Sequence, residues 1–408
     1  MNRVAETTGR RFFRITAYIW VLLFFVGWAG PTPPALAYEG KVEKQVIEIP
    51  SYTTVEGRTI KMLKMGYETY GKLNPKGTNA ILIPPFFGGN SHSAGKYRED
   101  DRFPGYWDSI IGSGKPLDTD RFFVISFDGL SNPNTKDGAT VSAGPASVDP
   151  DTGKPYGMTF PTLTIRDFVN VQKVLVNSLG VKKVYMVMGA SMGAMQAFEW
   201  AAAFPDMVER IIPVVGDAEC DAFTIGVLES WMAPIKADPH WNNGSYYGAE
   251  EPMQGVKTAM KIVLMETRQS EWANKSFGRK WASPDKDPAK SMENLFAVQK
   301  FVEDAASERA EKYDANSLLY QVRAIQLFSV GEAVSPAVGL KQIKAKVLLL
   351  PGENDILFPS ARAGELRDIL AKQGNQASIF VLEGPLGHMN GILGISQASE
   401  AISKFLAN

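Results

Sequence analysis

Residues Gly189-Ala190-Ser191-Met192-Gly193 set a serine between two glycines, directly after the apolar run Val184 to Met188. A helix-forming run, Ala194 to Ala203, follows. A strand, a tight turn and a helix in this order are the context in which Gly-x-Ser-x-Gly forms a nucleophile elbow. The glycines leave room for a strained turn that exposes the Ser191 hydroxyl. A five-residue pattern also arises by chance, so the flanking segments carry this interpretation.

Strand-like and helix-like segments alternate on both sides of this turn. Apolar runs typical of strands occupy residues 46–49, 61–70, 79–84, 122–127, 184–188, 211–215, 346–350 and 378–382. Helical spacing of apolar residues marks 165–179 and the closing segment 395–406. This alternation predicts an α/β fold with a mostly parallel central sheet flanked by helices.

The alternation stops between residues 218 and 340, where helical patterns occur without strand-like runs. We therefore expect a helical lid at 218–340, inserted into a core made of 38–217 and 341–408. In such folds an insertion lies above the carboxyl ends of the strands, where ligands bind.

A serine hydroxyl becomes a useful nucleophile when a base takes its proton and a carboxylate orients that base. The chain has three histidines, and only His388 follows the last strand-like run. It lies in a glycine-rich loop, which predicts a mobile, exposed imidazole. Asp355 follows the strand-like run 346–350 and is the expected acid, with Glu353 as its competitor. The chain order Ser191, Asp355, His388 is that of α/β-hydrolases.

The oxyanion that forms during acyl transfer needs backbone donors that are already aimed at it. We expect one from the amide of Met192, at the positive end of the elbow helix. The second is expected from the loop after 79–84, with Phe87 as our choice and Phe86 as the alternative. His92 is predicted either to contact substrate or to lie in a surface loop, and His240 to be structural.

The N-terminus reads as a separate segment. Arg10, Arg11 and Arg14 precede an apolar run at 15–28, and Ala35-Leu-Ala37 resembles a cleavage site. This order predicts a signal peptide over 1–37 and an exported protein, periplasmic or secreted, with no stable membrane insertion after cleavage. An uncleaved anchor is the alternative. Arg10-Arg11 also resembles a twin-arginine signal.

Composition bounds the remaining function classes. The 408 residues are 45% hydrophobic and 21% charged, with a formal net charge of −1, so charge gives no reason to expect binding to nucleic acid. The single cysteine, Cys220, cannot form an internal disulfide and is expected to be a small buried residue. Nothing in the sequence indicates a metal site or a cofactor.

Several longer stretches together resemble the homoserine O-acetyltransferase family of the α/β-hydrolase superfamily. They are Trp107 to Gly112, Leu117 to Val124, Gly144 to Pro150, Gly153 to Gly157, Thr164 to Asp167, Ala190 to Gln196, Glu199-Trp200 and Tyr313 to Ser317. The resemblance implies a triad of Ser191, Asp355 and His388, an oxyanion donor at Phe87, and a homodimer formed through the lid.

Four positions depart from the family pattern. Met389 stands where the family has an Asp expected to hold the homoserine amino group, and Met232 where it has an Arg expected to meet the carboxylate. Pro85 stands in place of a His and Ala194 in place of a Gly. Leaving an amino acid's charges unpaired in a closed site is unfavourable.

These departures, together with the predicted export, favour a serine esterase that acts on a small-molecule ester through an acyl-enzyme. The alternative is an O-acyltransferase that moves an acyl group from acyl-CoA to a hydroxyl acceptor. A binding protein that kept the fold is the third possibility.

Overall fold

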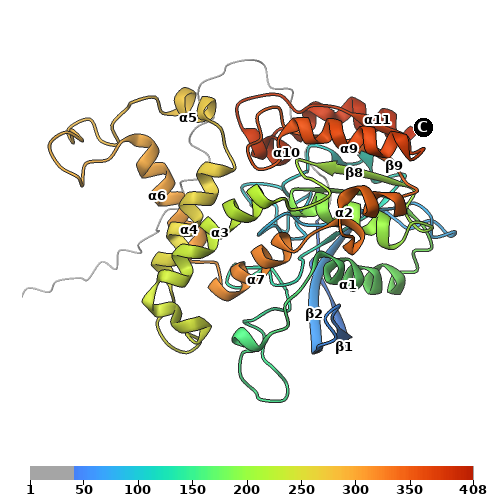
Figure 1. The fold of residues 1–408 in the computed structure, drawn as a ribbon, viewed down its shortest axis with the longest axis horizontal. Helices are drawn as coiled ribbons and strands as arrows, with labels where there is room; N and C mark the ends of the chain where they lie inside the picture. Colours follow the sequence, from blue (N-terminus) through green and yellow to red (C-terminus); the bar gives the residue numbers. More distant parts are fainter. Residues whose placement is uncertain (1–40, 408) are drawn as a thin grey trace, which may run out of the picture. The chain divides into compact units, whose positions relative to one another are not determined.

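The structure is a computed structural model and describes residues 41–407, so the predicted signal peptide lies outside the described part. Eight strands form one sheet in the order β1-β2-β6-β3-β7-β8-β9-β10. The labels of β1 and β2 lie on one side of the picture and those of β8 and β9 on the other (Figure 1). Their bounds are β1 Gln45–Thr53, β2 Thr59–Tyr70, β3 Ala80–Ile83, β6 Phe123–Phe127, β7 Val184–Ala190, β8 Arg210–Val214, β9 Lys346–Leu349 and β10 Ala377–Ile379. Within this sheet of the described residues, β2 alone runs opposite to the other strands, because it pairs antiparallel with both β1 and β6. The predicted α/β-hydrolase fold, with its mostly parallel sheet, is confirmed.

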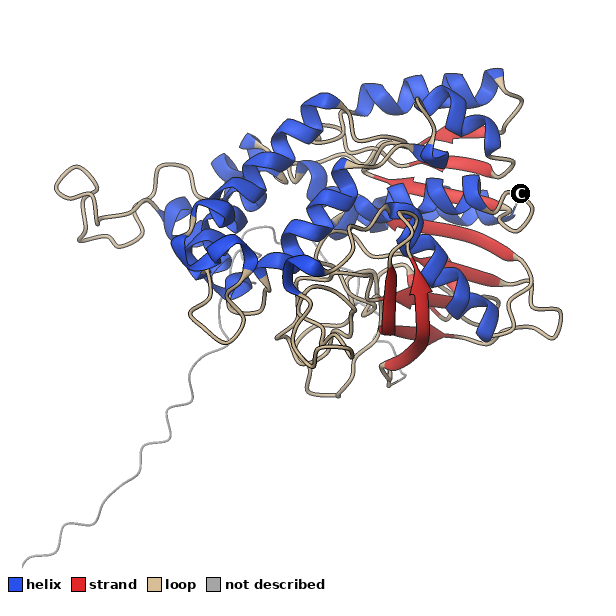
Figure 2. Cartoon of the chain, turned by 60° about the horizontal axis from the view of Figure 1, so that its bottom comes forward, coloured by secondary structure: helices blue, strands red, loops and turns tan. Residues whose placement is uncertain are grey.

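Helices cover both faces of the sheet (Figure 2). Buried side chains of α1 (Ile165–Ser178), α2 (Met192–Ala203) and α9 (Ser360–Lys372) join one apolar cluster. Those of α11 (Ser399–Ala407) join a second cluster. Side chains of β3 alternate between the two clusters and are all buried. This two-sided burial explains why the strand reads as a continuous apolar run.

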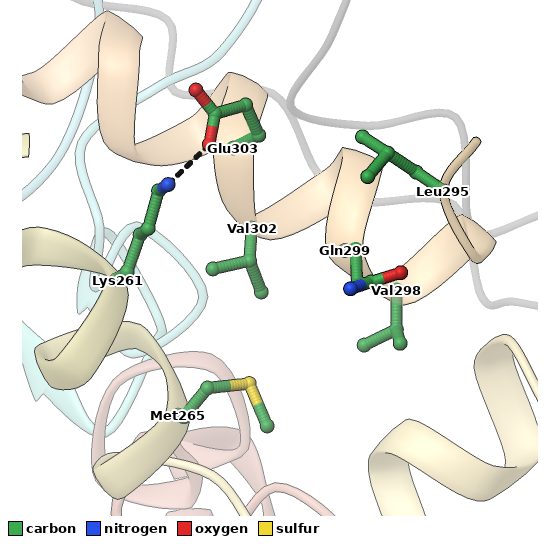
Figure 3. A pocket seen from close by; sticks show the side chains of 7 residues that line it. All are labelled: Lys261, Met265, Leu295, Val298, Gln299, Val302 and Glu303. Atoms are coloured by element: carbon green, nitrogen blue, oxygen red, sulfur yellow. Dashed lines mark ion pairs between the residues drawn. The ribbon is translucent and has the colours of Figure 1, made fainter. Parts of the chain in front are cut away.

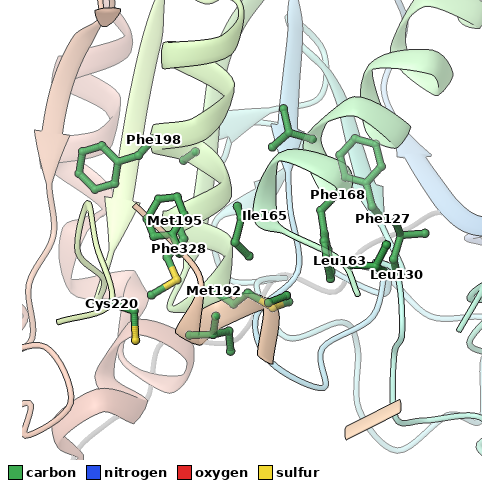
Figure 4. Close-up of a cluster of buried hydrophobic side chains, with 14 of the residues drawn as sticks. Phe127, Leu130, Leu163, Ile165, Phe168, Met192, Met195, Phe198, Cys220 and Phe328 are labelled. Carbon is green, nitrogen blue, oxygen red and sulfur yellow. The ribbon is translucent and has the colours of Figure 1, made fainter. Parts of the chain in front are cut away.

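Helix α2, which begins directly after Ser191, lies deep in the first cluster. Its Met192, Met195 and Phe198 pack near Phe328 and Cys220 (Figure 4). Cys220 is buried as expected, and burial raises the pKa of its thiol to about 12. The elbow is therefore followed by a helix that is tightly packed in the core.

Between β8 and β9 the described chain forms helices and no strand of the sheet. The helices are α3 Ala222–Ala237, α4 Met253–Glu266, α5 Ser270–Ser276, α6 Ala297–Ala310, α7 Ala315–Gln326 and α8 Pro336–Gly339. A β-bridge between Glu219 and Ser329 joins the outgoing and returning chain. The boundaries 218 and 340 stay predictions, and we call this segment the helical insertion. None of the helices within residues 41–407 is long and apolar enough to cross a membrane.

A cavity of 390 Å³ lies between α4 and α6 of the insertion (Figure 3). It is lined by Lys261, Met265, Leu295, Val298, Gln299, Val302 and Glu303. An ion pair between Lys261 and Glu303 closes one edge. None of the predicted catalytic residues lines this cavity, and the homodimer implied for this part of the chain stays a prediction.

Candidate active site

Ser191 occupies the turn between β7 and α2 in a backbone conformation rare for residues other than glycine. Its φ is 57° and its ψ −120°, and its amide donates to the carbonyl oxygen of Val214 at 2.9 Å. A Cβ at Gly189 would lie 2.4 Å from the carbonyl oxygen of Gly193, and a Cβ at Gly193 2.6 Å from that of Pro84. Both flanking glycines are therefore required by close backbone approaches, as a nucleophile elbow demands.

The expected acid and base meet after β9 and β10. His388 Nδ1 lies 2.7 Å from Asp355 Oδ2, and both side chains are buried. Asp355 Oδ1 accepts from the amides of Leu357 at 2.9 Å and Phe358 at 3.2 Å. Since Nδ1 faces a carboxylate, it carries the ring proton and leaves Nε2 to act as base. Glu353 is exposed, so the structure joins His388 to Asp355 and not to its competitor.

The expected exposure of His388 is wrong. Its side chain is only 7% exposed and lies in a short 3-10 turn, Gly387–Met389. The helical insertion covers this turn. The amide of Met389 donates to the carbonyl oxygen of Thr267 at 3.2 Å, and Gln269 Nε2 donates to that of Gly384 at 2.8 Å.

The elbow and the segment directly after the histidine turn both contact residues 215 and 216, which follow β8. A Cβ at Gly216 would lie 3.0 Å from the carbonyl oxygen of Ser191, and one at Gly391 would lie 2.4 Å from Val215. No hydrogen bond joins Ser191 to His388 within the described residues. Such catalytic bonds often tighten only when substrate binds.

The predicted oxyanion donors lie at two adjoining backbone turns. Gln196 Nε2, on α2, donates to the carbonyl oxygen of Pro85 at 2.9 Å and so holds the loop against the elbow helix. The Gly89 amide closes a turn by donating to Phe86 at 2.8 Å. Across residues 41–407 the amides of Met192 and Phe87 find no protein acceptor, and neither does that of Phe86. Phe87 stays the predicted donor and Phe86 the alternative.

A buried polar network beside this loop was not predicted from the sequence. Glu68 on β2 is fully buried and accepts from Tyr97 at 2.7 Å and Tyr70 at 2.8 Å. His92 Nδ1 lies 3.2 Å from the same carboxylate, and Lys44 pairs with it at 3.2 Å. Burial opposes the charge of Glu68, but His92, Lys44 and Tyr97 outweigh it and lower its pKa to about 2.

The two remaining histidines are thereby placed. His92 belongs to this network and stacks on Tyr97, and its side chain is only 17% exposed, so it is not an open surface-loop residue; its contact with substrate stays a prediction. His240 is half-exposed at the start of a 3-10 segment in the insertion, beside Asp238 and Glu250. The sequence did contain a signal for the network, namely Glu68 inside a strand-like run. A buried carboxylate is unfavourable unless it has partners, so partners for Glu68 could have been expected.

Comparison with known proteins agrees with the fold. A family model described as the alpha/beta hydrolase fold matches residues 81–394. The homoserine O-acetyltransferase of Solidesulfovibrio magneticus is 36% identical over 90% of this chain and 93% of its own length. That of Carboxydothermus hydrogenoformans is 32% identical over 90% and 96%.

Two solved structures share the fold closely. Esterase E22 is 43% identical with a TM-score of 0.85, covering 90% of this chain and 100% of its own. The homoserine O-acetyltransferase from Bacillus anthracis is 34% identical with a TM-score of 0.86, covering 90% and 98%. The chain therefore belongs to the homoserine O-acetyltransferase family of the α/β-hydrolase superfamily.

Proposed function

We propose that this protein is a serine esterase that forms an acyl-enzyme on Ser191 and passes the acyl group to water. The observation that carries the proposal is the 2.7 Å contact between His388 and Asp355. Asp355 follows β9, and the strained Ser191 follows β7, two strands away in the same sheet. Nucleophile, base and orienting acid are the minimum set for this chemistry.

The reaction follows from the roles of these groups. Ser191 Oγ attacks the ester carbonyl while His388 Nε2 accepts its proton. The amides of Met192 and Phe87 donate to the oxyanion, and the alcohol leaves with the proton from His388. Water then attacks the acyl-enzyme with His388 again as base, and the acyl bond to Ser191 Oγ breaks as His388 returns the proton to that oxygen. Asp355 holds the imidazole and stabilises its protonated form throughout.

The choice of water as acceptor rests on two methionines. Met232 is buried in α3, and Met389 directly follows the base. Neither thioether can pair with the ammonium or carboxylate of an amino-acid acceptor, whereas the Asp and Arg expected at these positions in the family can. Esterase E22 is also more similar in sequence to this chain than the Bacillus anthracis acetyltransferase is, at 43% against 34% identity.

Acyl transfer to a hydroxyl acceptor is the second candidate. The names of the curated relatives fit it better than hydrolysis, because those relatives are homoserine O-acetyltransferases. Transfer uses the same acyl-enzyme as hydrolysis and differs only in the acceptor of the acyl group, which is a hydroxyl compound instead of water. Export, if it occurs, would separate the enzyme from cytosolic acyl-CoA.

Two parallel assays on purified protein separate the candidates. One follows release of p-nitrophenol from p-nitrophenyl acetate, and the other follows CoA release from acetyl-CoA with and without homoserine. Ser191→Ala is the test variant, and Ser51→Ala, at an exposed serine on β1, is the matched control.

We expect ester hydrolysis that falls by about 10³-fold or more in Ser191→Ala and stays unchanged in Ser51→Ala. CoA release that depends on homoserine would overturn hydrolysis in favour of transfer. Absence of both activities in the wild-type protein would point to the binding-protein alternative.

A further inference from the structure

The turn Phe86–Gly89, which carries the predicted oxyanion donor, is held by side chains from two other parts of the chain. Gly88 N–H donates to Gln321 Oε1 at 2.8 Å. Asn134 Nδ2 donates to the Gly88 carbonyl oxygen, and Asn132 Nδ2 to that of Gly89, both at 2.6 Å. Side chains thus bind three of the turn's polar backbone groups, whereas Phe87 N–H has no protein acceptor in residues 41–407.

Gln321 is fully buried on α7, in the helical insertion, and its two amide atoms are both used. While Oε1 accepts from Gly88, Nε2 donates to the carbonyl oxygen of Leu130 at 3.3 Å. A donor at one end and an acceptor at the other fix the orientation of the side-chain amide. A buried group matched in this way is a strong local constraint, because breaking it leaves unpaired polar atoms.

The constraint acts on the peptide that directly follows Phe87, whereas Phe87 N–H belongs to the peptide before it. Anchoring the second peptide limits how the Phe87 Cα between the two peptides can move. Gly88 has a φ of 65°, and rotation of the Phe87–Gly88 peptide is the easiest rearrangement of a turn with glycine at this place. Rotation would turn the Phe87 carbonyl oxygen toward Gln321 Oε1 and bring two acceptors together. Tyr313 adds a steric limit, since a Cβ at Gly88 would lie 2.5 Å from its hydroxyl.

We propose that Gln321 is a positioning residue for the oxyanion hole: by accepting Gly88 N–H it fixes the turn that presents Phe87 N–H to the substrate. This inference rests on the proposed acyl-enzyme chemistry and links the helical insertion to the catalytic step. Gln321 touches no reacting atom. Its effect should therefore appear where negative charge develops on the carbonyl oxygen, in kcat, and not in ground-state binding.

The kinetic test compares two leucine substitutions on the same helix. Gln321→Leu removes the acceptor for Gly88. Gln326→Leu makes the same change at a buried glutamine whose Nε2 donates to Ile225, at the start of α3. With p-nitrophenyl acetate we expect Gln321→Leu to lower kcat about 10- to 100-fold with KM within about threefold. Gln326→Leu should leave both constants within about twofold of wild type.

Gln321→Glu provides a conservative variant in case Gln321→Leu does not fold. The carboxyl group that this substitution introduces has both an acceptor and a donor when it is protonated, whereas its ionised form loses the donor to Leu130. The ratio of the variant's kcat to that of wild type should therefore fall as pH rises. A ratio independent of pH, or kcat of Gln321→Leu within twofold of wild type, would overturn the inference.

A second readout needs no substrate, so it separates this inference from the proposed function. The sequence contains Phe-Gly twice, at 87–88 and 277–278. Labelling Phe carbonyl carbons with ¹³C and Gly nitrogens with ¹⁵N therefore isolates two amide signals, and Gly278, which donates to Asn274, serves as the internal reference. In Gln321→Leu, exchange of the Gly88 amide with solvent should accelerate at least about tenfold while Gly278 is unchanged. Unchanged protection of Gly88 would refute the role of Gln321 even if the wild-type enzyme proved to be a transferase.

Discussion

Ser191 presents its hydroxyl from the elbow in a backbone conformation that is unfavourable for any residue with a Cβ atom. At φ 57° and ψ −120°, a residue with a Cβ is strained by about 1–3 kcal/mol. The hydrogen bond from its amide to Val214 and the buried helix after it hold this conformation in place. Strain at a reactive residue is thus balanced by packing elsewhere.

This strain gives a prediction for two inactive variants. Ser191→Gly should be more stable than Ser191→Ala by about 1 kcal/mol, because glycine adopts the conformation without a Cβ clash. Urea unfolding of both proteins measures the difference. Equal stability, or a more stable alanine variant, would show that the backbone at Ser191 is not strained.

At the residue scale the sequence predicted the pairing of Asp355 with His388 but not the burial of the pair. Ser191, Asp355 and His388 were chosen from chain order and strand ends, and the structure pairs Asp355 with His388 in preference to Glu353. The burial of His388 was missed, because its cover comes from Thr267 and Gln269, more than a hundred residues earlier. Contacts between residues so far apart in the chain cannot be predicted from a local sequence pattern.

At the element scale, the elbow helix α2 and the loop after β3 touch through their backbones. Gly193 is the point of contact, since a Cβ there would meet Pro84 at 2.6 Å. The loop cannot retreat freely, because Gln196 on the same helix binds the carbonyl oxygen of Pro85. The predicted nucleophile and the loop with the predicted oxyanion donor therefore form one assembly.

Gly193→Ala should separate the two elements of this assembly. We expect a loss of about 1–3 kcal/mol in the free energy of unfolding, as for other overpacked sites, together with reduced ester hydrolysis. Gly226→Ala is the control, since Gly226 lies on α3 with open space around its Cβ position. It should stabilise the protein by about 0.5–1 kcal/mol. Thermal and urea unfolding check both, and a Gly193→Ala protein as active as wild type would contradict the contact.

Strands buried on both faces were the elements best predicted from sequence. The apolar runs 79–84, 184–188, 211–215 and 346–350 all match strands to within a few residues. Helix α9 was not predicted, because only Ala363, Leu366 and Leu370 along its 13 residues are buried and its apolar stripe is faint. The antiparallel orientation of β2 was not predicted either, since orientation depends on which strands it pairs with.

On the scale of the whole molecule, the Glu68 network joins segments that are remote in the chain. Lys44 precedes β1, Glu68 lies on β2, His92 and Tyr97 follow the oxyanion loop, and Asp128 follows β6. Lys44 pairs with Asp128 at 2.7 Å as well as with Glu68. Four segments of the chain are thereby tied together beside the candidate active site.

This network predicts an acid-sensitive contribution to stability. The folded-state pKa of Glu68, about 2, lies below its usual value, so its contribution is fully present above about pH 4.5 and is lost as pH falls toward 2. The loss should be on the order of 3 kcal/mol. Glu68→Gln should lack this part of the pH dependence, so its stability should approach that of wild type as pH falls from 4.5 to 2. Urea unfolding over that range measures the difference, and a constant gap between the two proteins would contradict it.

The insertion's bonds to both catalytic loops have a consequence for protein engineering. Thr267 accepts from Met389 and Gln269 donates to Gly384, on either side of His388, while Gln321 accepts from Gly88 in the turn that carries the predicted oxyanion donor. A chimera that replaces 219–329 with a relative's helices, in order to borrow its substrate preference, would also replace these acceptors and donors. The helical insertion and the segments that carry the predicted catalytic residues are therefore not interchangeable parts. A successful graft has to carry matching partners for Met389, Gly384 and Gly88 along with its new binding surface.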